Sequence, residues 1–355
     1  MRRYAPIFLL SLCLVMVAFV GSLLLSGHAD EKTEEFLPEL MIYTTLPAET
    51  VQSLLTEEAQ KQGLKLQVRS FSTSADLLKQ LQQEQQTPQA SFILTERMAL
   101  LRAKKEKRLQ EFLSEEADLV SDSLKDEDDF WVGLWYDPYV FVVNRDAAKQ
   151  WKSVPNDWED IVKQSELRVA MTDFLAAEAP AQLMEQLSEV YGSRECLAYL
   201  AKLHPQVVRY AKFLSTPVRM AGMGEADLAI TPYSEAEKYV RDQFPVRLVW
   251  PEHGTAYMLT GGALVKGGPM QSEAKKMLDW LLSPACAQKR EAISLLALPA
   301  NPEIQKTPRP VLWELRDEAL PEGMRQKQLE AWLQNIRLGL KAPEGNGIRM
   351  EEQKK

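Results

Sequence analysis

The sequence predicts an α/β fold with a largely parallel sheet, arranged in two lobes. Strand-like and helix-like segments alternate regularly between residues 40 and 94, which is the pattern of a parallel α/β unit. The 355 residues, 45% of them hydrophobic, are enough for two domains of ordinary size. The net charge of −8 argues against a general nucleic-acid binder, and three cysteines are too few for a disulfide-built scaffold.

Residues 1–29 are expected to be a signal peptide or a membrane anchor. Arg2 and Arg3 precede an apolar run over residues 5–25, and Gly27 and Ala29 occupy the small-residue positions of a cleavage site. The run is also long enough to span a bilayer as one helix. Cleavage is the first expectation and an uncleaved anchor stays open, but both place the folded part outside the cytoplasmic membrane.

The elements of the first lobe follow from local spacing. Residues 40–45 form a short strand-like run, and residues 49–62 place apolar side chains on one helical face before Gly63 ends the helix. Residues 64–68 alternate like a strand, a second helix follows residues 72–74, and residues 90–94 predict the next strand.

The most apolar segment after the leader covers residues 131–144. It is too short to cross a membrane as a helix, and Asp137-Pro138 interrupts it, so we expect two strand pieces joined at a bend. Further strands are predicted at 167–171, 226–230 and 246–250, and helices at 176–191, 194–203 and 272–297. Apolar residues at helical spacing follow from residue 310, and residues 341–355 are a polar tail.

Several segments together resemble the extracellular solute-binding proteins of bacterial ABC importers, in the branch that includes iron(III)-binding members. Four stretches carry the resemblance: residues 41–45, 131–144, 224–231 and 251–266. Residues 274–284 then form a helix that ends in Leu-Leu-Ser-Pro, as in the family. The resemblance covers residues 38–302.

The resemblance implies a two-lobed periplasmic-binding-protein-like (type II) fold with two crossover hinge segments. The first lobe would hold residues 36–136 and 260–340, and the second residues 140–250. It also implies an extracytoplasmic receptor that captures a small molecule or metal ion by hinge closure and delivers it to an ABC permease. A monomer without a cofactor is expected.

Open α/β sheets bind ligands beyond the carboxyl ends of their strands, and this rule selects the candidate ligand-binding residues. Tyr136 lies at the predicted junction of the lobes, and Tyr233 follows a predicted strand. The full set is Thr44, Thr45, Ser74, Tyr136, Thr172, Asp173 and Tyr233. Taken alone, Ser74 is expected to cap a helix.

Asp173 marks a departure from the family. Many relatives carry a turn rich in serine and threonine there, whereas this chain has Asp173-Phe174-Leu175. A carboxylate at a helix start caps the helix and repels an anionic ligand. The sequence at Asp173 therefore favours a cationic or metal-bearing ligand over an anionic one. Iron(III) would suit oxygen ligands, but the adjacent tyrosine pair of well-known iron binders is missing. His253 and His204 are expected to have surface or structural roles.

Two other classes of protein stay open. A membrane-anchored sensor or adaptor would use the same fold with altered or lost ligand binding. A carboxylate-based hydrolase is the weaker alternative, because neither a G-x-S-x-G turn nor an H-E-x-x-H pair is found and no catalytic residues are proposed. A disulfide between Cys196 and Cys286 is chemically allowed, but their spacing does not decide it.

Overall fold

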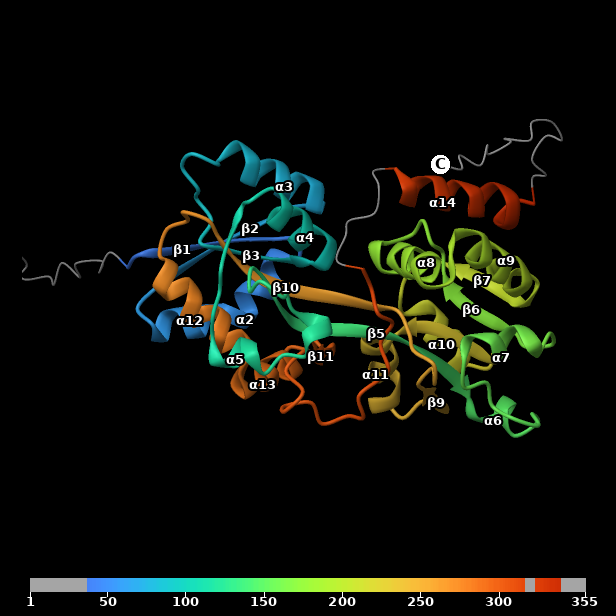
Figure 1. The fold of residues 1–355 in the computed structure, drawn as a ribbon. Coiled ribbons are helices and arrows are strands. Elements are labelled where there is room, and N and C mark those ends of the chain that lie inside the picture. Colours follow the sequence, from blue (N-terminus) through green and yellow to red (C-terminus); the bar gives the residue numbers. More distant parts are fainter. Residues whose placement is uncertain (1–36, 317–322, 340–355) are drawn as a thin grey trace, which may run out of the picture. The chain divides into compact units, whose positions relative to one another are not determined.

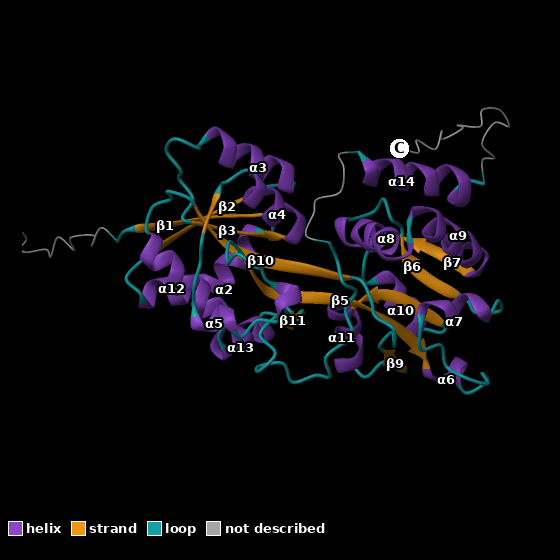
Figure 2. Cartoon of the chain, in the orientation of Figure 1, coloured by secondary structure: helices purple, strands orange, loops and turns teal. Residues whose placement is uncertain are grey.

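The computed structural model describes residues 37–316 and 323–339 (Figure 1). Strands and helices alternate along this part of the chain, as the sequence predicts (Figure 2). The predicted leader over residues 1–29 and the polar tail over 341–355 lie outside the described residues. In the described ranges, no helix combines the length and apolar character that a bilayer span requires.

The first group of strands is parallel. β1 (Glu39–Thr44) pairs with β2 (Lys65–Ser70) on one side and with β3 (Phe92–Glu96) on the other. The helices that follow these strands are α2 (Ala48–Lys61), α3 (Ser74–Gln83) and α4 (Arg97–Lys105). The α/β unit predicted for residues 40–94 is therefore confirmed, and all three strands end at the same edge of the sheet.

The second group repeats this arrangement. β6 (Val169–Thr172) pairs in parallel with β7 (Val207–Ala211) and with β8 (Leu228–Pro232). The main helices of this group are α8 (Glu178–Tyr191), α9 (Ser193–Leu203), α10 (Thr216–Gly222) and α11 (Tyr233–Arg241). The predicted helices at 176–191 and 194–203 are thus confirmed within a few residues.

Two strands connect the groups. β5 (Val132–Asn144) pairs through its first half with β10 (Tyr257–Val265) and β11 (Leu298–Pro299). Its second half pairs with β8 and β9 (Val246–Val249). The strand order is β2-β1-β3-β10-β5-β8-β6-β7, and Figure 2 shows β5 and β10 running between the two groups.

The expected break at Asp137-Pro138 is wrong, because β5 is one continuous strand. The dipeptide instead lies where β5 exchanges its first set of partners for its second. Proline has no N–H for the sheet, but the next amide, of Tyr139, donates to Ala256 O at 2.8 Å. The chain therefore changes partners at this proline without leaving the extended conformation.

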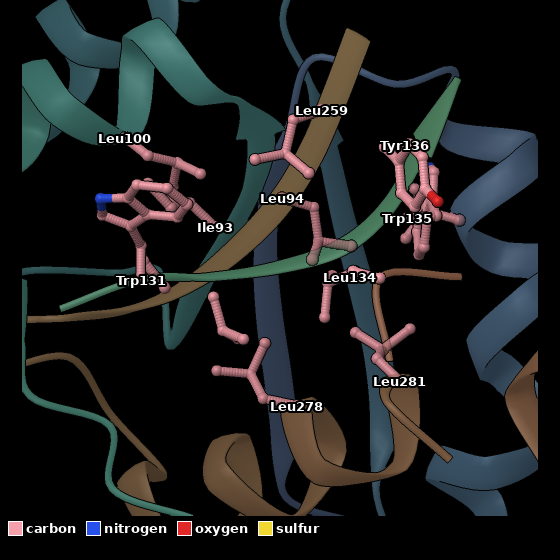
Figure 3. Packing of buried hydrophobic residues seen from close by; sticks show 14 of the residues in the cluster. Ile93, Leu94, Leu100, Trp131, Leu134, Trp135, Tyr136, Leu259, Leu278 and Leu281 are labelled. Atoms are coloured by element: carbon pink, nitrogen blue, oxygen red, sulfur yellow. The ribbon is translucent and has the colours of Figure 1, made fainter. Parts of the chain in front are cut away.

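Close packing at β10 depends on a glycine. A Cβ atom on Gly262 would lie 2.6 Å from Leu278 Cδ2 and 3.3 Å from Leu134 Cδ1. Figure 3 shows Leu278 and Leu281 of α12 (Gln271–Leu281) pointing toward Leu134. Glycine at position 262 thus lets α12 pack directly on the connecting strands.

The single helix predicted over residues 272–297 is wrong. The chain forms α12 and then α13 (Pro284–Ala292). Ser283 Oγ accepts a hydrogen bond from Cys286 N at 3.3 Å, and Pro284 occupies the first turn of α13. Serine at the N-cap followed by proline is a helix start, so the Leu-Leu-Ser-Pro sequence ends one helix and begins the next.

The C-terminal segment packs with the second group of strands, not with the first lobe as expected for residues up to 340. Trp332, at the end of α14 (Met324–Trp332), is fully buried with its ring 5.0 Å from that of Phe174. Trp313 lies in the same hydrophobic cluster, and α14 lies beside α8 and α9 (Figure 1). Helical spacing of apolar residues shows which side chains are buried but not which surface receives them.

The remaining elements are short. They are β4 (Leu109–Gln110), α5 (Glu115–Asp118), η1 (Asp122–Leu124), α6 (Arg145–Ala148), α7 (Trp158–Lys163), η2 (His204–Gln206) and η3 (Leu333–Arg337). Cys196 in α9 and Cys286 in α13 are both free and buried.

Candidate functional site

A small pocket lies where the strand ends of the first group face helix α8 of the second. We call it the cleft pocket. Its volume is about 30 Å³, roughly the space of one water molecule. It is lined by Glu96, Arg97, Met98, Gln182, Glu185, Gln186, Glu189, Tyr257, Leu259 and Leu315.

The first wall is built from the carboxyl ends of β1 and β3. Thr45 Oγ1 lies 3.0 Å from Thr95 Oγ1, which donates to Glu96 Oε2 at 2.8 Å. The carboxylate of Glu96 therefore stands at the end of a short chain of hydroxyl groups. Parallel strands end at one edge of the sheet, and this is why residues 45 and 95 meet.

The second wall is a polar stripe on α8. Gln182, Glu185, Gln186 and Glu189 recur at spacings of three and four residues, so they share one helical face. Gln186 donates from Nε2 to Tyr257 O at 2.7 Å and accepts at Oε1 from Tyr257 N at 2.9 Å. Its amide thus joins α8 to β10 by two hydrogen bonds.

The cleft pocket has three carboxylates and one guanidinium. Burial raises the pKa of Glu185, and the nearby carboxylates of Glu178, Glu189 and Glu96 raise it further, whereas Arg325 lowers it. Arg325 Nε lies 3.9 Å from Glu185 Oε2. The pocket is therefore a region of negative charge that is only partly neutralised by the chain itself.

Residues 311–316, which we call the strap, cover this region. Leu312 forms a parallel bridge with Thr255, and the amide of Arg316 donates to the carboxylate of Glu189. Arg97 Nη2 donates to Leu315 O at 3.2 Å and to Arg316 O at 2.9 Å. The strap is thus bonded to both walls of the cleft pocket.

The connecting strand carries a buried carboxylate. Asp137 Oδ1 accepts from Ser234 N at 2.8 Å, and Oδ2 accepts from Ser234 Oγ at 2.6 Å. Burial is the main reason why the pKa of Asp137 rises to about 6, and the bonds from Ser234 act against it. Asp137 therefore ties β5 to the start of α11.

None of the seven residues predicted from strand ends lines the cleft pocket itself. Thr45 comes nearest, through Thr95 and Glu96. Thr44 is fully buried, and its Oγ1 accepts from Leu46 N at 3.0 Å. Ser74 is the first residue of α3, but the helix cap is Thr73, whose Oγ1 accepts from Asp76 N at 3.1 Å.

The two tyrosines lie elsewhere. Tyr136 is buried and donates to Gln305 Oε1 at 2.8 Å, and its burial raises the pKa to about 12. Tyr233 stacks on Trp250 with ring centroids 5.3 Å apart. It lines a second pocket of about 360 Å³, and Gln305 lines it too.

Thr172 is the last residue of β6 and Asp173 follows it, but neither begins a helix. Thr172 is buried, and its Oγ1 has no hydrogen-bond partner in the part of the chain that the structure describes. Asp173 accepts from Leu175 N at 2.9 Å and lies 3.6 Å from Arg337 Nε. The expectation that Asp173 caps a helix is wrong, because α8 begins five residues later, at Glu178.

Strand-end reasoning missed the residues that line the cleft pocket. Glu96 and Arg97 lie two and three residues after the strand predicted at 90–94, so the same rule could have selected them. The four polar residues of α8 were detectable as a stripe at helical spacing, but only the fold shows that this stripe faces a strand end. The strap comes from a distant part of the chain. Its residues belong to the apolar run from residue 310 with helical spacing, but residues 311–316 form no helix.

The two histidines of the described residues do not line the cleft pocket. His204 Nδ1 lies 2.9 Å from Tyr210 Oη, and the exposed His253 pairs with Asp157 at 2.7 Å. Within residues 37–316 and 323–339, no cluster of three or more His, Cys, Asp or Glu side chains is placed to hold a metal ion.

Comparison with known proteins identifies the family to which the chain belongs. The pattern of the bacterial extracellular solute-binding proteins matches residues 90–316. An uncharacterised protein of Haemophilus influenzae is 31% identical over 135 residues, which are 37% of this chain and 38% of the relative. The match thus spans less than half the length of this curated relative.

Solved structures share the fold. The periplasmic binding protein AfuA of Actinobacillus pleuropneumoniae, with fructose-6-phosphate bound, has a TM-score of 0.64 at 19% identity, covering 85% of this chain and 99% of that one. Iron-bound HitA of Pseudomonas aeruginosa has a TM-score of 0.65 at 18% identity, covering 82% and 97%. A Bordetella ferric binding protein reaches 0.68 at 18% identity, with the same coverage of 82% and 97%. With its strand order, its connecting strands and a family match over more than half its length, the chain belongs to the bacterial extracellular solute-binding proteins.

Proposed function

We propose that the protein is an extracytoplasmic receptor of an ABC import system that captures a cationic solute in the cleft pocket. The observation that carries the charge assignment is the set of three carboxylates, Glu96, Glu185 and Glu189, around one pocket. The family match supports the receptor role, because members of the family bind solutes rather than transform them. The proposed partner is a membrane permease.

The sign of the charge follows from how each group is bound. The guanidinium of Arg97 is already engaged by two carbonyl oxygens of the strap. The carboxylate of Glu185 is buried, and its pKa is raised first by that burial and then by the neighbouring carboxylates, which disfavour its ionised form. A bound cation would relieve that repulsion, whereas a phosphate would add to it.

Capture would require movement, because the cleft pocket holds about 30 Å³. We propose that β5 and β10 bend near Asp137 and Tyr257, so that the lobes open for the solute and close on it. Each lobe contributes a wall, and Gln186 and the strap bond across the gap. Closure is favoured to the extent that the solute binds the closed form better than the open one.

The proposal also assigns a role to residues 1–29. Residues 1–29 would direct the chain across the membrane and be removed, leaving a monomeric carrier. The alternative is a membrane-anchored sensor or adaptor with altered solute binding, which the small volume and the strap favour. N-terminal sequencing of the exported protein separates the two: a start at Asp30 indicates the carrier, and retention of Arg2 indicates the anchor.

The solute class is tested by calorimetric titration of the purified protein with a ferric salt, putrescine, spermidine and fructose 6-phosphate. We expect one of the cations to bind and fructose 6-phosphate not to bind. Cation affinity should also increase as the pH rises through the raised pKa of Glu185, because the ionised carboxylate is the binding form. The iron and polyamine arms decide whether the cation is a metal or an organic amine.

A selective response to fructose 6-phosphate would contradict the charge assignment and leave the receptor role intact. Failure of every arm, with small-angle scattering profiles that do not change on ligand addition, would favour the sensor or adaptor.

A further inference from the structure

The pocket that contains Tyr233 has the features of a second binding site. We call it the hinge pocket. It lies between α11 and the segment from α13 to residue 307, and it shares no lining residue with the cleft pocket. Its volume of about 360 Å³ is within the range of pockets that bind small molecules.

A buried arginine, Arg290, lines the hinge pocket. Arg290 is only 4% exposed, and its Nη1 donates to Ala297 O at 3.1 Å. Its guanidinium carbon lies 5.1 Å from the centre of the Trp135 ring. Among the described residues, no carboxylate lies within ion-pair distance of it.

A buried arginine that is not paired with a carboxylate is unusual. Charged side chains are rarely buried without a partner, because removing an ion from water costs several kcal/mol. Burial lowers the pKa of Arg290, and the opposing influence comes from the Cys286 thiol rather than from a carboxylate. The other arginine of the pocket, Arg241, is already paired with Glu237 at 2.9 Å and Glu291 at 3.0 Å.

The remaining walls are largely apolar. Leu295, Leu296, Leu298, Ile304 and Pro299 line the pocket beside the guanidinium. Tyr233 also lines the pocket, and burial together with the neighbouring Glu237 raises the pKa of its hydroxyl. Two carboxylates, Glu291 and Glu303, also line the pocket and would oppose a doubly charged ligand.

We propose that the hinge pocket binds a small organic carboxylate with a single negative charge. Its carboxylate would accept hydrogen bonds from the guanidinium of Arg290, and its apolar body would lie against Leu295, Leu298 and Ile304. A planar guanidinium and a planar carboxylate form paired, charge-assisted hydrogen bonds. This site is independent of the solute proposed for the cleft pocket.

The test uses benzoate and hexanoate as probes, with benzamide and hexanamide as neutral counterparts of the same shape. Binding to the full exported protein is followed by ligand-observed NMR and by calorimetry up to about 10 mM, the millimolar range expected of small fragments. We expect a carboxylate to bind at least tenfold more tightly than its amide. Equal binding of the two, or no binding of either carboxylate, would overturn the proposal.

Variants locate the site. Arg290→Met should reduce carboxylate affinity at least tenfold, whereas Lys289→Met, on the same helix but paired with Glu57 at 3.0 Å, should leave it unchanged. Ala287→Trp should fill the pocket and block binding while Arg290 is retained. Thermal unfolding of each variant shows whether it is folded, and carboxylate binding that survives both Arg290→Met and Ala287→Trp would contradict the assignment.

Discussion

The cleft pocket and the hinge pocket share no lining residue and differ in size and in charged groups. The cleft pocket measures about 30 Å³ and is rich in carboxylates, whereas the hinge pocket measures about 360 Å³ and has a buried guanidinium. In the cleft, the chain supplies partners for its charges, namely Thr95 for Glu96 and Arg325 for Glu185. In the hinge pocket, Arg290 contacts a carbonyl oxygen and an aromatic ring, and within residues 37–316 and 323–339 no carboxylate pairs with it.

The difference shows that the volume of a pocket and its position at the strand ends are separate properties in this molecule. The larger hollow is not where the strand ends meet, and the pocket at the strand ends is small because Gln186, Arg97 and the strap bond across it. The acidic pocket therefore needs a change of shape to accept a solute. The hinge pocket already has the volume for the proposed carboxylate, whose charge would complement that of Arg290.

The largest expected effect concerns Asp137, which lies in the strand between the two pockets. Its pKa of about 6 is above the value of 3.8 for a free aspartate, so the folded state binds a proton more tightly than the unfolded one. The group's contribution to stability is present below pH 3.8 and is lost as the pH rises through 6, a difference of roughly 3 kcal/mol. Asp137→Asn should remove this part of the pH dependence.

The measurement is the free energy of unfolding by urea at several pH values between about 4 and 7. The exposed Asp146→Asn serves as the control, because its carboxylate pairs with Lys149 at the surface. A pH profile that is unchanged in Asp137→Asn would mean that the carboxylate of Asp137 is solvated in solution.

The next effect tests the acidic character of the cleft pocket. Glu185→Gln should weaken binding of the identified cation by about 10- to 100-fold, the range for loss of one charge-assisted hydrogen bond. It should also flatten the rise of affinity with pH. The exposed Glu166→Gln is the matched control, and benzoate binding at the hinge pocket should be equal in both variants.

A smaller effect is expected when the strap is released from the first wall. Arg97→Met removes the donor to Leu315 O and Arg316 O, and we expect a loss of about 2 kcal/mol of stability. Spin labels on α4 and α9 would report the distance between the groups by pulsed electron resonance. A broader distance distribution in the variant is the expected result, and an unchanged one would show that the strap does not hold the cleft closed.

The smallest effect concerns the hydroxyl chain behind Glu96. Thr45→Val keeps the shape of the side chain and removes its bond to Thr95, which should cost about 1 kcal/mol of stability and a few-fold of cation affinity. Thr56→Val, whose hydroxyl bonds within the exposed face of α2, controls for the general effect of the substitution. Cation binding that is unaffected by Thr45→Val would limit the site to the α8 wall.

Local spacing predicted much of the fold because the signals are short in range. The buried face of α2 was readable as Val51, Leu54, Leu55 and Ala59, and the strands at residues 40–45 and 90–94 followed from short apolar runs. The errors came from long-range packing. Pro138 does mark a change in the sheet, because β5 changes partner strands there, but pairing on both sides of the proline keeps β5 extended.

The sequence by itself determined the α/β alternation, the apolar connecting segment and the family resemblance, because each depends on residues close together in the chain. Only the tertiary structure decided that the α8 stripe faces Glu96, that the strap crosses the cleft and that Trp332 joins the second group of strands. It also placed Arg290 in a pocket where no carboxylate of the described residues pairs with it. These are contacts between residues tens to hundreds of positions apart, and their partners are selected by the packed shape of the whole chain rather than by any local pattern.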